Sequence, residues 1–186
     1  MSNLYYEVDK ADLKRVTDAI TGAGKKAPNV IRNAINRTAT RVKKAIDYST
    51  NSAYTMKRSE YKNSIKILRA TPSHLDAIIK ATGKPRTLKE YKYTYPKSGV
   101  RSDITRSGLK DLALDGGGHA FMIGGDGLIA QRRGKDRLPI RVPKSVSAPK
   151  MVEKVYKGER GVEGDMEPKT RKVLHDEIQA EIKKLI

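Results

Sequence analysis

Few residues in this chain have the type and spacing that catalysis or metal binding requires. His74, His119 and His175 fall in three separate predicted elements, and no pair of them has metal-ligand spacing. The chain has no cysteine, which excludes thiolate chemistry, disulfides and Cys-based zinc sites. The carboxylates between residues 163 and 167 stand beside glycine, as in an exposed turn, whereas a calcium loop needs a longer graded set of ligands. No recognisable nucleophile setting occurs, so we expect no enzyme, no cofactor and no metal site.

A glycine-rich stretch at residues 115–127 (DGGGHAFMIGGDG) invites comparison with a phosphate-binding loop. No Lys-Ser or Lys-Thr pair follows it, and no strand-loop-helix unit encloses it. Turns at the ends of strands explain these glycines.

The most prominent chemical feature is an excess of positive charge, which is concentrated in the middle of the chain. The formal net charge is +18, from 39 Lys and Arg against 21 Asp and Glu. Residues 21–70 hold 12 basic residues against 2 acidic ones, and residues 131–150 hold 7 against 1. The simplest interpretation is a solvated basic surface. The functional interpretation is that the protein binds a polyanion, either nucleic acid or an acidic protein surface, because the electric field of a basic surface attracts phosphates and steers association.

Two basic segments are candidate contacts with a partner or with DNA: a predicted hairpin tip and one side of a predicted helix. Their residues are Arg132, Arg133, Lys135, Arg137, Arg37, Arg41, Lys43 and Lys44. The tip is suited either to DNA or to a neighbouring subunit, and composition alone does not separate the two.

Helical periodicity is clear in three places. Leu13, Val16 and Ile20 indicate a helix over 9–22, and Pro28 stands in the first turn of a helix that continues to Ile46. The second helix has an apolar stripe of mostly small residues, which favours close packing. A last helix is expected over 168–186.

Strands and turns fill most of the rest. Residues 65–70 and 76–82 predict an antiparallel pair, and 120–123 with 128–131 predict a hairpin whose chain returns along an edge segment, 138–142. A helix is then expected to begin near Ser147.

Other segments are less regular. Residues 50–61 suggest a polar loop with a short helix after it, and 96–118 suggest a long flexible arm. Tyr91, Tyr93 and Tyr95 alternate with Lys92 and Thr94, a pattern suited to stacking bases or to a packed or interface face.

Together these elements predict an α+β fold, with an antiparallel sheet packed against N-terminal helices and followed by a C-terminal helix. We expect one domain over 1–186, helical over 1–48, mainly β over 62–147 and helical over 148–186. With no Trp and a single Phe, the aromatic core is thin, which favours an elongated shape stabilised by neighbouring subunits. Neither a secretory signal nor a bilayer-spanning run is evident, so the expected setting is the cytoplasm, away from membranes.

Three segments, in order, resemble the minor tail protein Z family, the tail-completion proteins of long-tailed bacteriophages and prophages. The first is Ala34 to Ile46 (AINRTATRVKKAI), built around an Asn-Arg pair, and the second is Ile65 to Ala81 (IKILRATPSHLDAIIKA). The third runs from His119 to Val155 and contains QRRGKDRLPIRV followed by SAPKMVEKV. The resemblance is weak from Thr87 to Gly118 and absent at both termini.

The resemblance implies a non-enzymatic structural protein of the virion tail, made in the host bacterial cytoplasm. Such a protein acts in tail completion at the head-proximal neck and supports head-tail joining and DNA passage. The implied partners are further copies in a ring, with a hexamer favoured, and the tail terminator, tail tube and head-tail connector proteins. Contact with phage DNA is a second implied role. The alternative is a free basic nucleic-acid-binding protein, although no helix-turn-helix, ribonucleoprotein motif or zinc signature is present.

Overall fold

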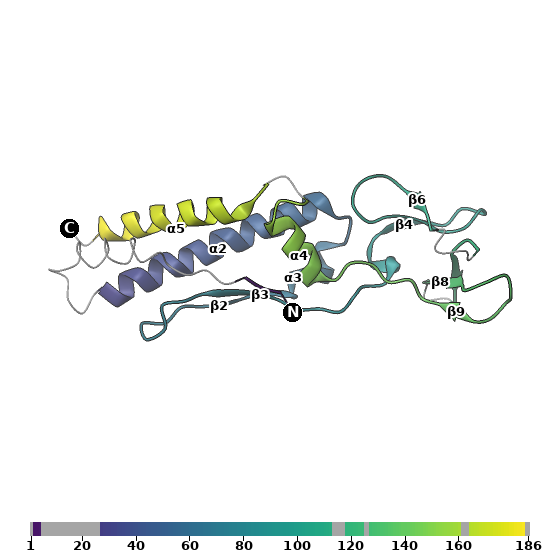
Figure 1. Cartoon of the computed structure of the whole chain (residues 1–186), viewed down its shortest axis with the longest axis horizontal. Helices are drawn as coiled ribbons and strands as arrows, with labels where there is room; N and C mark the ends of the chain where they lie inside the picture. The colour runs from purple at the N-terminus through teal and green to yellow at the C-terminus, as the bar shows by residue number, and fades with distance from the viewer. Residues whose placement is uncertain (1, 5–26, 113–117, 125–126, 161–163, 185–186) are drawn as a thin grey trace.

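The computed structural model describes residues 2–4, 27–112, 118–124, 127–160 and 164–184. The molecule is elongated, with a helical half and a β half end to end (Figure 1).

The helical elements are α2 (Ala27–Ala53), α3 (Arg58–Lys62), α4 (Ala148–Tyr156), α5 (Met166–Ile182) and the 3-10 turn η2 (Leu88–Glu90). The strands are β1 (Ser2–Leu4), β2 (Ile65–Leu68), β3 (Ile78–Ala81), β4 (Lys92–Thr94), β5 (Arg101–Asp103), β6 (Lys110–Asp111), β7 (Phe121–Ile123), β8 (Leu128–Arg132) and β9 (Ile140–Arg141).

The α+β class is confirmed, with three small antiparallel sheets in place of the single sheet we expected. Their strand orders are β1-β3-β2, β4-β5-β6 and β7-β8-β9. Because β1 is a strand, the described part of 1–48 is not wholly helical. The predicted helix over 9–22 lies outside the described residues.

The long helix α2 forms the spine of the helical half. Its predicted apolar stripe is confirmed, and Ala34 and Ile46 have no exposed surface. The expectation that a loop begins at Thr50 is wrong, because the helix continues to Ala53. Ser49 and Thr50 are buried there, and helical geometry satisfies their backbone groups.

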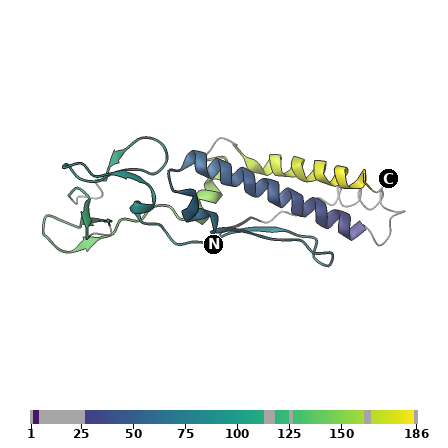
Figure 2. The same cartoon turned by 180° about the vertical axis from the view of Figure 1, so that it is seen from behind.

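Helix α5 runs antiparallel to α2 along its length (Figures 1 and 2). Leu174, Ile178 and Ile182 pack against the first half of α2. The helix begins two residues before the predicted Pro168, because the Asp165 carboxylate caps it by accepting from the Glu167 N–H at 3.0 Å.

The hairpin β2–β3 lies beside α2, opposite α5 (Figure 1), and confirms the predicted pairing. Ile65 stands across from Ala81, and Ile67 from Ile79. These apolar residues face the helices, while Leu68 at the end of β2 is 53% exposed.

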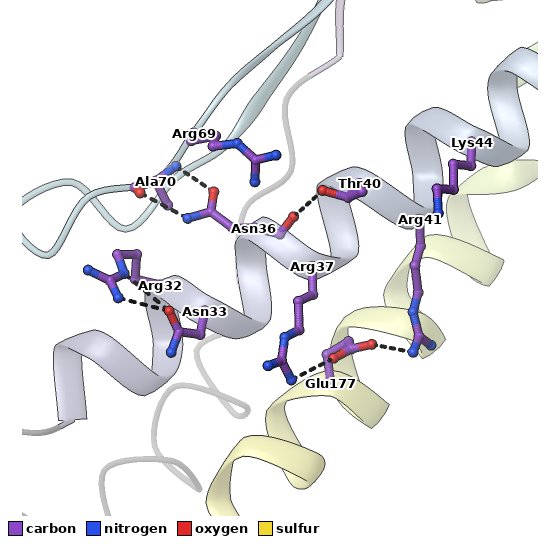
Figure 3. A pocket seen from close by; sticks show the side chains of 10 residues that line it. All are labelled: Arg32, Asn33, Asn36, Arg37, Thr40, Arg41, Lys44, Arg69, Ala70 and Glu177. Carbon is purple, nitrogen blue, oxygen red and sulfur yellow. Dashed lines mark hydrogen bonds and ion pairs between the residues drawn. The ribbon is translucent and has the colours of Figure 1, made fainter.

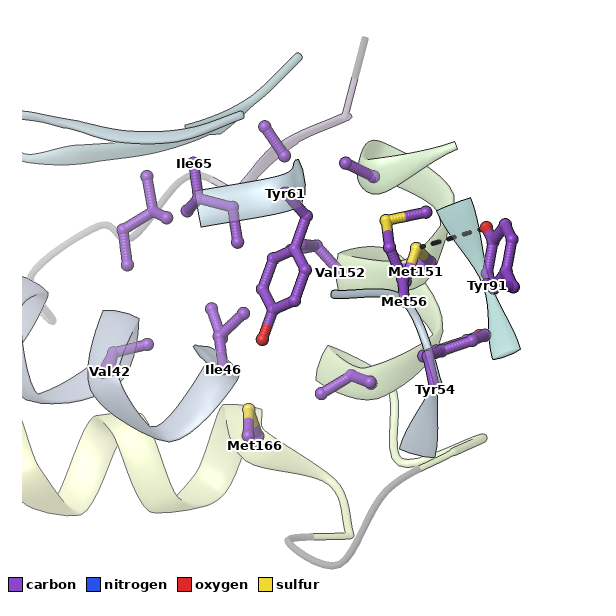
Figure 4. Close-up of a cluster of buried hydrophobic side chains, with 14 residues drawn as sticks. Val42, Ile46, Tyr54, Met56, Tyr61, Ile65, Tyr91, Met151, Val152 and Met166 are labelled. Carbon is purple, nitrogen blue, oxygen red and sulfur yellow. Dashed lines mark hydrogen bonds between the residues drawn. The ribbon is translucent and has the colours of Figure 1, made fainter. Parts of the chain in front are cut away.

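Tyrosine supplies the aromatic core of the helical half (Figure 4). Tyr54, Tyr61 and Tyr91 are almost fully buried beside methionines of the 54–56 turn and of α4. The Tyr91 hydroxyl donates to the Val146 carbonyl at 2.8 Å, and burial raises the pKa of Tyr91 to about 12. The packing interpretation therefore holds for Tyr91 and, more weakly, for the half-buried Tyr93.

The expectation of a long flexible arm over 96–118 is wrong for residues 96–112. Strands β5 and β6 lie there and pair with β4. Val100 and Leu112 are buried in the β half, so a few well-placed apolar residues give this polar segment its core. Residues 113–117 lie outside the described part.

The other β predictions are confirmed. Strands β7 and β8 form the hairpin that turns through Gly124 and Gly127, both with positive φ. Strand β9 pairs at the edge of that sheet, and α4 follows Ser147.

Backbone hydrogen bonds join the two halves near the end of α2. The Thr55 N–H donates to the Ile104 carbonyl at 3.1 Å, and the Thr55 hydroxyl accepts from the Lys92 N–H at 3.2 Å. The Ser145 N–H donates to the Arg86 carbonyl at 2.7 Å, which ties together the two connecting segments that lead from β3 to η2 and from β9 to α4.

Three apolar clusters follow one another along the molecule. One lies between the first half of α2 and α5, one at the end of α2 against α4, and one in the β half. Ile67 packs against both of the first two clusters, and Ile104 packs against the second and the third.

Candidate interaction site

Polar residues at every fourth position give α2 a polar row. Arg32, Asn36, Thr40 and Lys44 are four residues apart, so their side chains lie on one side of the helix, about 6 Å apart along its axis. Arg37 and Arg41 form a second row beside the first.

The polar row forms one wall of an open groove of about 810 Å³, which we call the basic groove (Figure 3). The end of β2 forms a second wall, and α5 closes one side. The lining residues are Arg32, Asn33, Asn36, Arg37, Thr40, Arg41, Lys44, Arg69, Ala70 and Glu177. Five cations and a single carboxylate thus face the same space.

The Asn36 side-chain amide fixes the position of the β2 wall. Its nitrogen donates to the Ala70 carbonyl at 3.0 Å, and its oxygen accepts from the Ala70 N–H at 2.9 Å. Ala70 is 4% exposed, so these bonds satisfy backbone groups that water scarcely reaches. The groove therefore has walls set by the fold.

Two predicted contact residues, Arg37 and Arg41, are held by carboxylates of α5. The Arg41 guanidinium lies 2.8 Å from the Glu177 carboxylate, and Arg37 pairs with Glu181 and lies 4.0 Å from Glu177. Lys184 also pairs with Glu181. Both carboxylates are nearly buried, so these pairs form a charged seam between α2 and α5.

The remaining cations of the groove are differently placed. Arg32 donates to the neighbouring Asn33 oxygen at 2.9 Å. Within the described part of the chain, neither Lys44 nor Arg69 has an ion-pair partner. Lys43, the other predicted contact on this helix, is half-buried and does not line the groove.

The charged seam predicts a pH-dependent stability. Burial alone would raise the pKa of Glu181, but the hydrogen bond from Lys184 and the charge of Arg37 together lower it. A carboxyl whose pKa is lower in the folded state stabilises the fold above its unfolded pKa of about 4.3, and this stabilisation is lost as the pH falls through the folded pKa. We expect the free energy of unfolding to fall below about pH 4.3, and Glu181→Gln to flatten that fall.

Urea unfolding at a series of pH values checks this prediction. Glu153→Gln is the comparison, because hydrogen bonds from Lys157 and Lys150 also lower the pKa of Glu153. Its ion pairs are exposed and screened by solvent, so this substitution should flatten the fall less than Glu181→Gln does. Parallel curves for the wild type and Glu181→Gln would contradict the prediction.

The predicted hairpin tip lies in the β half, far from the basic groove (Figure 1). Arg133, Lys135 and Arg137 are exposed there. The Arg132 guanidinium instead makes a contact within the protein, because it lies over the Phe121 ring, 5.6 Å from the ring centroid. The structure thus places four of the eight predicted residues at the hairpin tip and four on α2, where Lys43 lies outside the groove.

The buried side chain of Gln131 holds the base of the tip through hydrogen bonds to the neighbouring chain segments. Its amide nitrogen donates to the Gly118 carbonyl at 2.9 Å, and its oxygen accepts from Arg141 at 3.1 Å. Leu138 and Ile140 are 68% and 40% exposed on the returning chain. The tip therefore presents cations beside apolar side chains on an edge segment.

Arg69 and Arg32 line the groove but are not among the eight candidate contact residues that the sequence indicated. Arg32 shares the four-residue spacing of Thr40 and Lys44, which was a usable signal. Arg69 comes from another element, and nothing in its local sequence places it beside α2.

The described residues include no group of three or more His, Asp or Glu side chains placed to hold a metal ion. His74 and His119 are exposed, and His175 is half-buried. None of the described helices has the length and apolar character needed to cross a bilayer. Neither a family model, nor a curated protein, nor a solved structure matches this chain.

Proposed function

We propose that this chain is a non-enzymatic structural component of a bacteriophage tail. It acts in tail completion at the head-proximal neck and supports head-tail joining and DNA passage. In this proposal the protein is made in the host bacterial cytoplasm and resides in the virion tail, as the resemblance to the minor tail protein Z family implies.

The observation that carries the proposal is where the three resembling segments lie. The first supplies the middle of α2, the second is the β2–β3 hairpin, and the third holds β7, β8, β9 and α4. The first two meet at the paired hydrogen bonds between Asn36 and Ala70. The resemblance thus involves the framework of the fold and the wall of the basic groove, which supports the proposal.

The molecule's shape and surfaces suit assembly. An elongated subunit with separate contact surfaces can bind a second copy through one surface and an unlike protein through another. Heterologous contacts of this kind close identical subunits into a ring, the geometry that the end of a tube needs. The edge strand β9, with the exposed Leu138 and Ile140, suits contact with a neighbouring subunit. Tail terminator, tail tube and head-tail connector proteins are the proposed unlike partners, and a hexamer is the proposed ring.

Imaging of intact particles tests this proposal. With an epitope tag on the chain, we expect antibody label at the neck and density for a ring between the tail tube and the head connector. Particles made without the chain should have tails that fail to join heads. A particle in which the chain is absent, or is an isolated subunit burying less than roughly 1,000 Å² against its neighbours, would overturn the proposal.

The second candidate function is free nucleic-acid binding, which the net charge of +18 and the basic groove favour. Binding to duplex DNA should then weaken steeply with salt, with a slope near the number of phosphates neutralised. A steep slope, together with absence of the chain from particles, would select this function.

A further inference from the structure

The basic groove combines hydrogen-bond donors and acceptors, and this mixture is informative about what binds there. Arg32, Lys44 and Arg69 supply donors and positive charge. Glu177 supplies a carboxylate that Arg41 already pairs at 2.8 Å. Thr40 supplies a hydroxyl whose own proton is donated within the helix to the Asn36 carbonyl at 2.8 Å, so its oxygen remains as an acceptor among the cations.

We propose that the basic groove binds an acidic, extended peptide segment of a partner protein, with carboxylates facing the groove cations and a backbone N–H group facing the Thr40 oxygen. This inference rests on the proposed function, because it assigns the docking chemistry by which the chain meets an unlike tail protein.

Spacing supports a peptide. In an extended strand, every second side chain lies on the same side, about 6.6 Å apart. Positions four apart on α2 repeat at about 6 Å. An extended segment lying along the helix thus stays in register with its turns. Carboxylates can then reach Arg32 and Lys44 at the two ends of the row, with Arg69 on the opposite wall.

Chemistry separates this ligand from nucleic acid. A sugar-phosphate backbone of DNA offers only acceptors, so the Thr40 oxygen would have no donor in it. Single-stranded nucleic acid is also bound by stacking its bases on aromatic side chains, and none lines the groove. A peptide backbone supplies an N–H donor for the Thr40 oxygen.

The groove is already organised for such a ligand. Paired hydrogen bonds between Asn36 and Ala70 hold the β2 wall, and Glu177 holds Arg41 at 2.8 Å. A partner therefore does not have to order these walls when it binds, which lowers the cost of association.

Fluorescence anisotropy with a labelled peptide of alternating Glu and Thr tests the binding step in the full-length protein. The matched probes are the Gln-Thr peptide and a duplex DNA of equal charge. The groove variant combines Arg32→Gln, Lys44→Gln and Arg69→Gln. The control variant combines Arg133→Gln, Lys135→Gln and Arg137→Gln at the hairpin tip, which removes the same charge in the other half of the molecule.

We expect the Glu-Thr peptide to bind and the Gln-Thr peptide not to bind. Three exposed ion pairs together correspond to about tenfold in affinity, so the groove variant should bind the acidic peptide about tenfold more weakly. The tip variant should stay within about threefold of the wild type. Circular dichroism should show both variants folded, since all six side chains are outside the apolar clusters.

Equal losses in the two variants would overturn the inference, because only general charge attraction would then operate. Tighter binding of the duplex, with loss of that binding in the groove variant, would also overturn it and would assign the groove to nucleic acid. If particles made with the groove variant complete their tails normally, the inference is wrong while the proposed function stands. If the wild-type chain is absent from the tail, the proposed function itself is wrong.

Discussion

Replacing Ile46 by alanine is expected to lower the free energy of unfolding by about 2 to 5 kcal/mol. Ile46 has no exposed surface and lies in the cluster where the end of α2 meets α3 and α4, beside Tyr61 and Val42 (Figure 4). Removing three carbons there costs the transfer free energy of the lost groups and leaves a cavity that close-packed neighbours fill only in part. For a domain stabilised by about 5 to 15 kcal/mol, this is a large fraction.

Urea unfolding of the Ile46→Ala protein measures this effect as a lower midpoint with an unchanged slope. Leu68→Ala is the matched control, because Leu68 is 53% exposed at the end of β2. Its cost should stay near 0.5 kcal/mol, as roughly expected for surface positions. Similar costs for the two substitutions would show that the buried cluster is not where the structure places it.

Replacing Asn36 by alanine has the second large expected effect, a lowering of the free energy of unfolding by about 1.5 to 5.5 kcal/mol. The substitution leaves the Ala70 N–H and carbonyl without their partner at a position only 4% exposed, and each unsatisfied group costs about 1 to 3 kcal/mol. The better helix propensity of alanine offsets roughly 0.5 kcal/mol of this. The β2–β3 hairpin should loosen from α2 as a result.

Hydrogen exchange locates this effect, because the Ala70 amide should exchange faster while amides of α4 change little. Asn51→Ala is the control, since Asn51 is exposed on the same helix. Asn36→Asp keeps an acceptor for the Ala70 N–H but removes the donor to its carbonyl, so its cost should be intermediate. An Asn36→Ala protein as stable as the Asn51→Ala protein would contradict the prediction.

The segments with regularly spaced apolar residues were predictable from the sequence, because that spacing alone indicates both the type of element and the face that is buried. The apolar stripe of α2 repeats at helical spacing, and the β2–β3 and β7–β8 pairs have apolar runs separated by turn residues. In these segments local preference and tertiary burial favour the same structure. The end of α2 was missed because Ser49 and Thr50 read as polar, although the fold buries both.

The candidate site was predictable only in part, for a related reason. Charge and helical spacing located the basic side of α2, but ion pairing depends on which helix packs beside it. Arg37 and Arg41 are four residues apart, as are Glu177 and Glu181. That matching spacing is a signal for an antiparallel charged seam, which could have been read before the structure was known. Arg69 reaches the groove through a tertiary contact that no local pattern encodes.

The arrangement of three clusters in series has a mechanical consequence. In a single round core, a load spreads over many contacts. Here α2 runs unbroken through the first two clusters, whereas Ile104 joins the second cluster to the third, so a push along the long axis reaches the β half through a narrow neck. Hydrogen bonds at Thr55 brace that neck. We therefore expect the compliance of the body to be concentrated between its two halves.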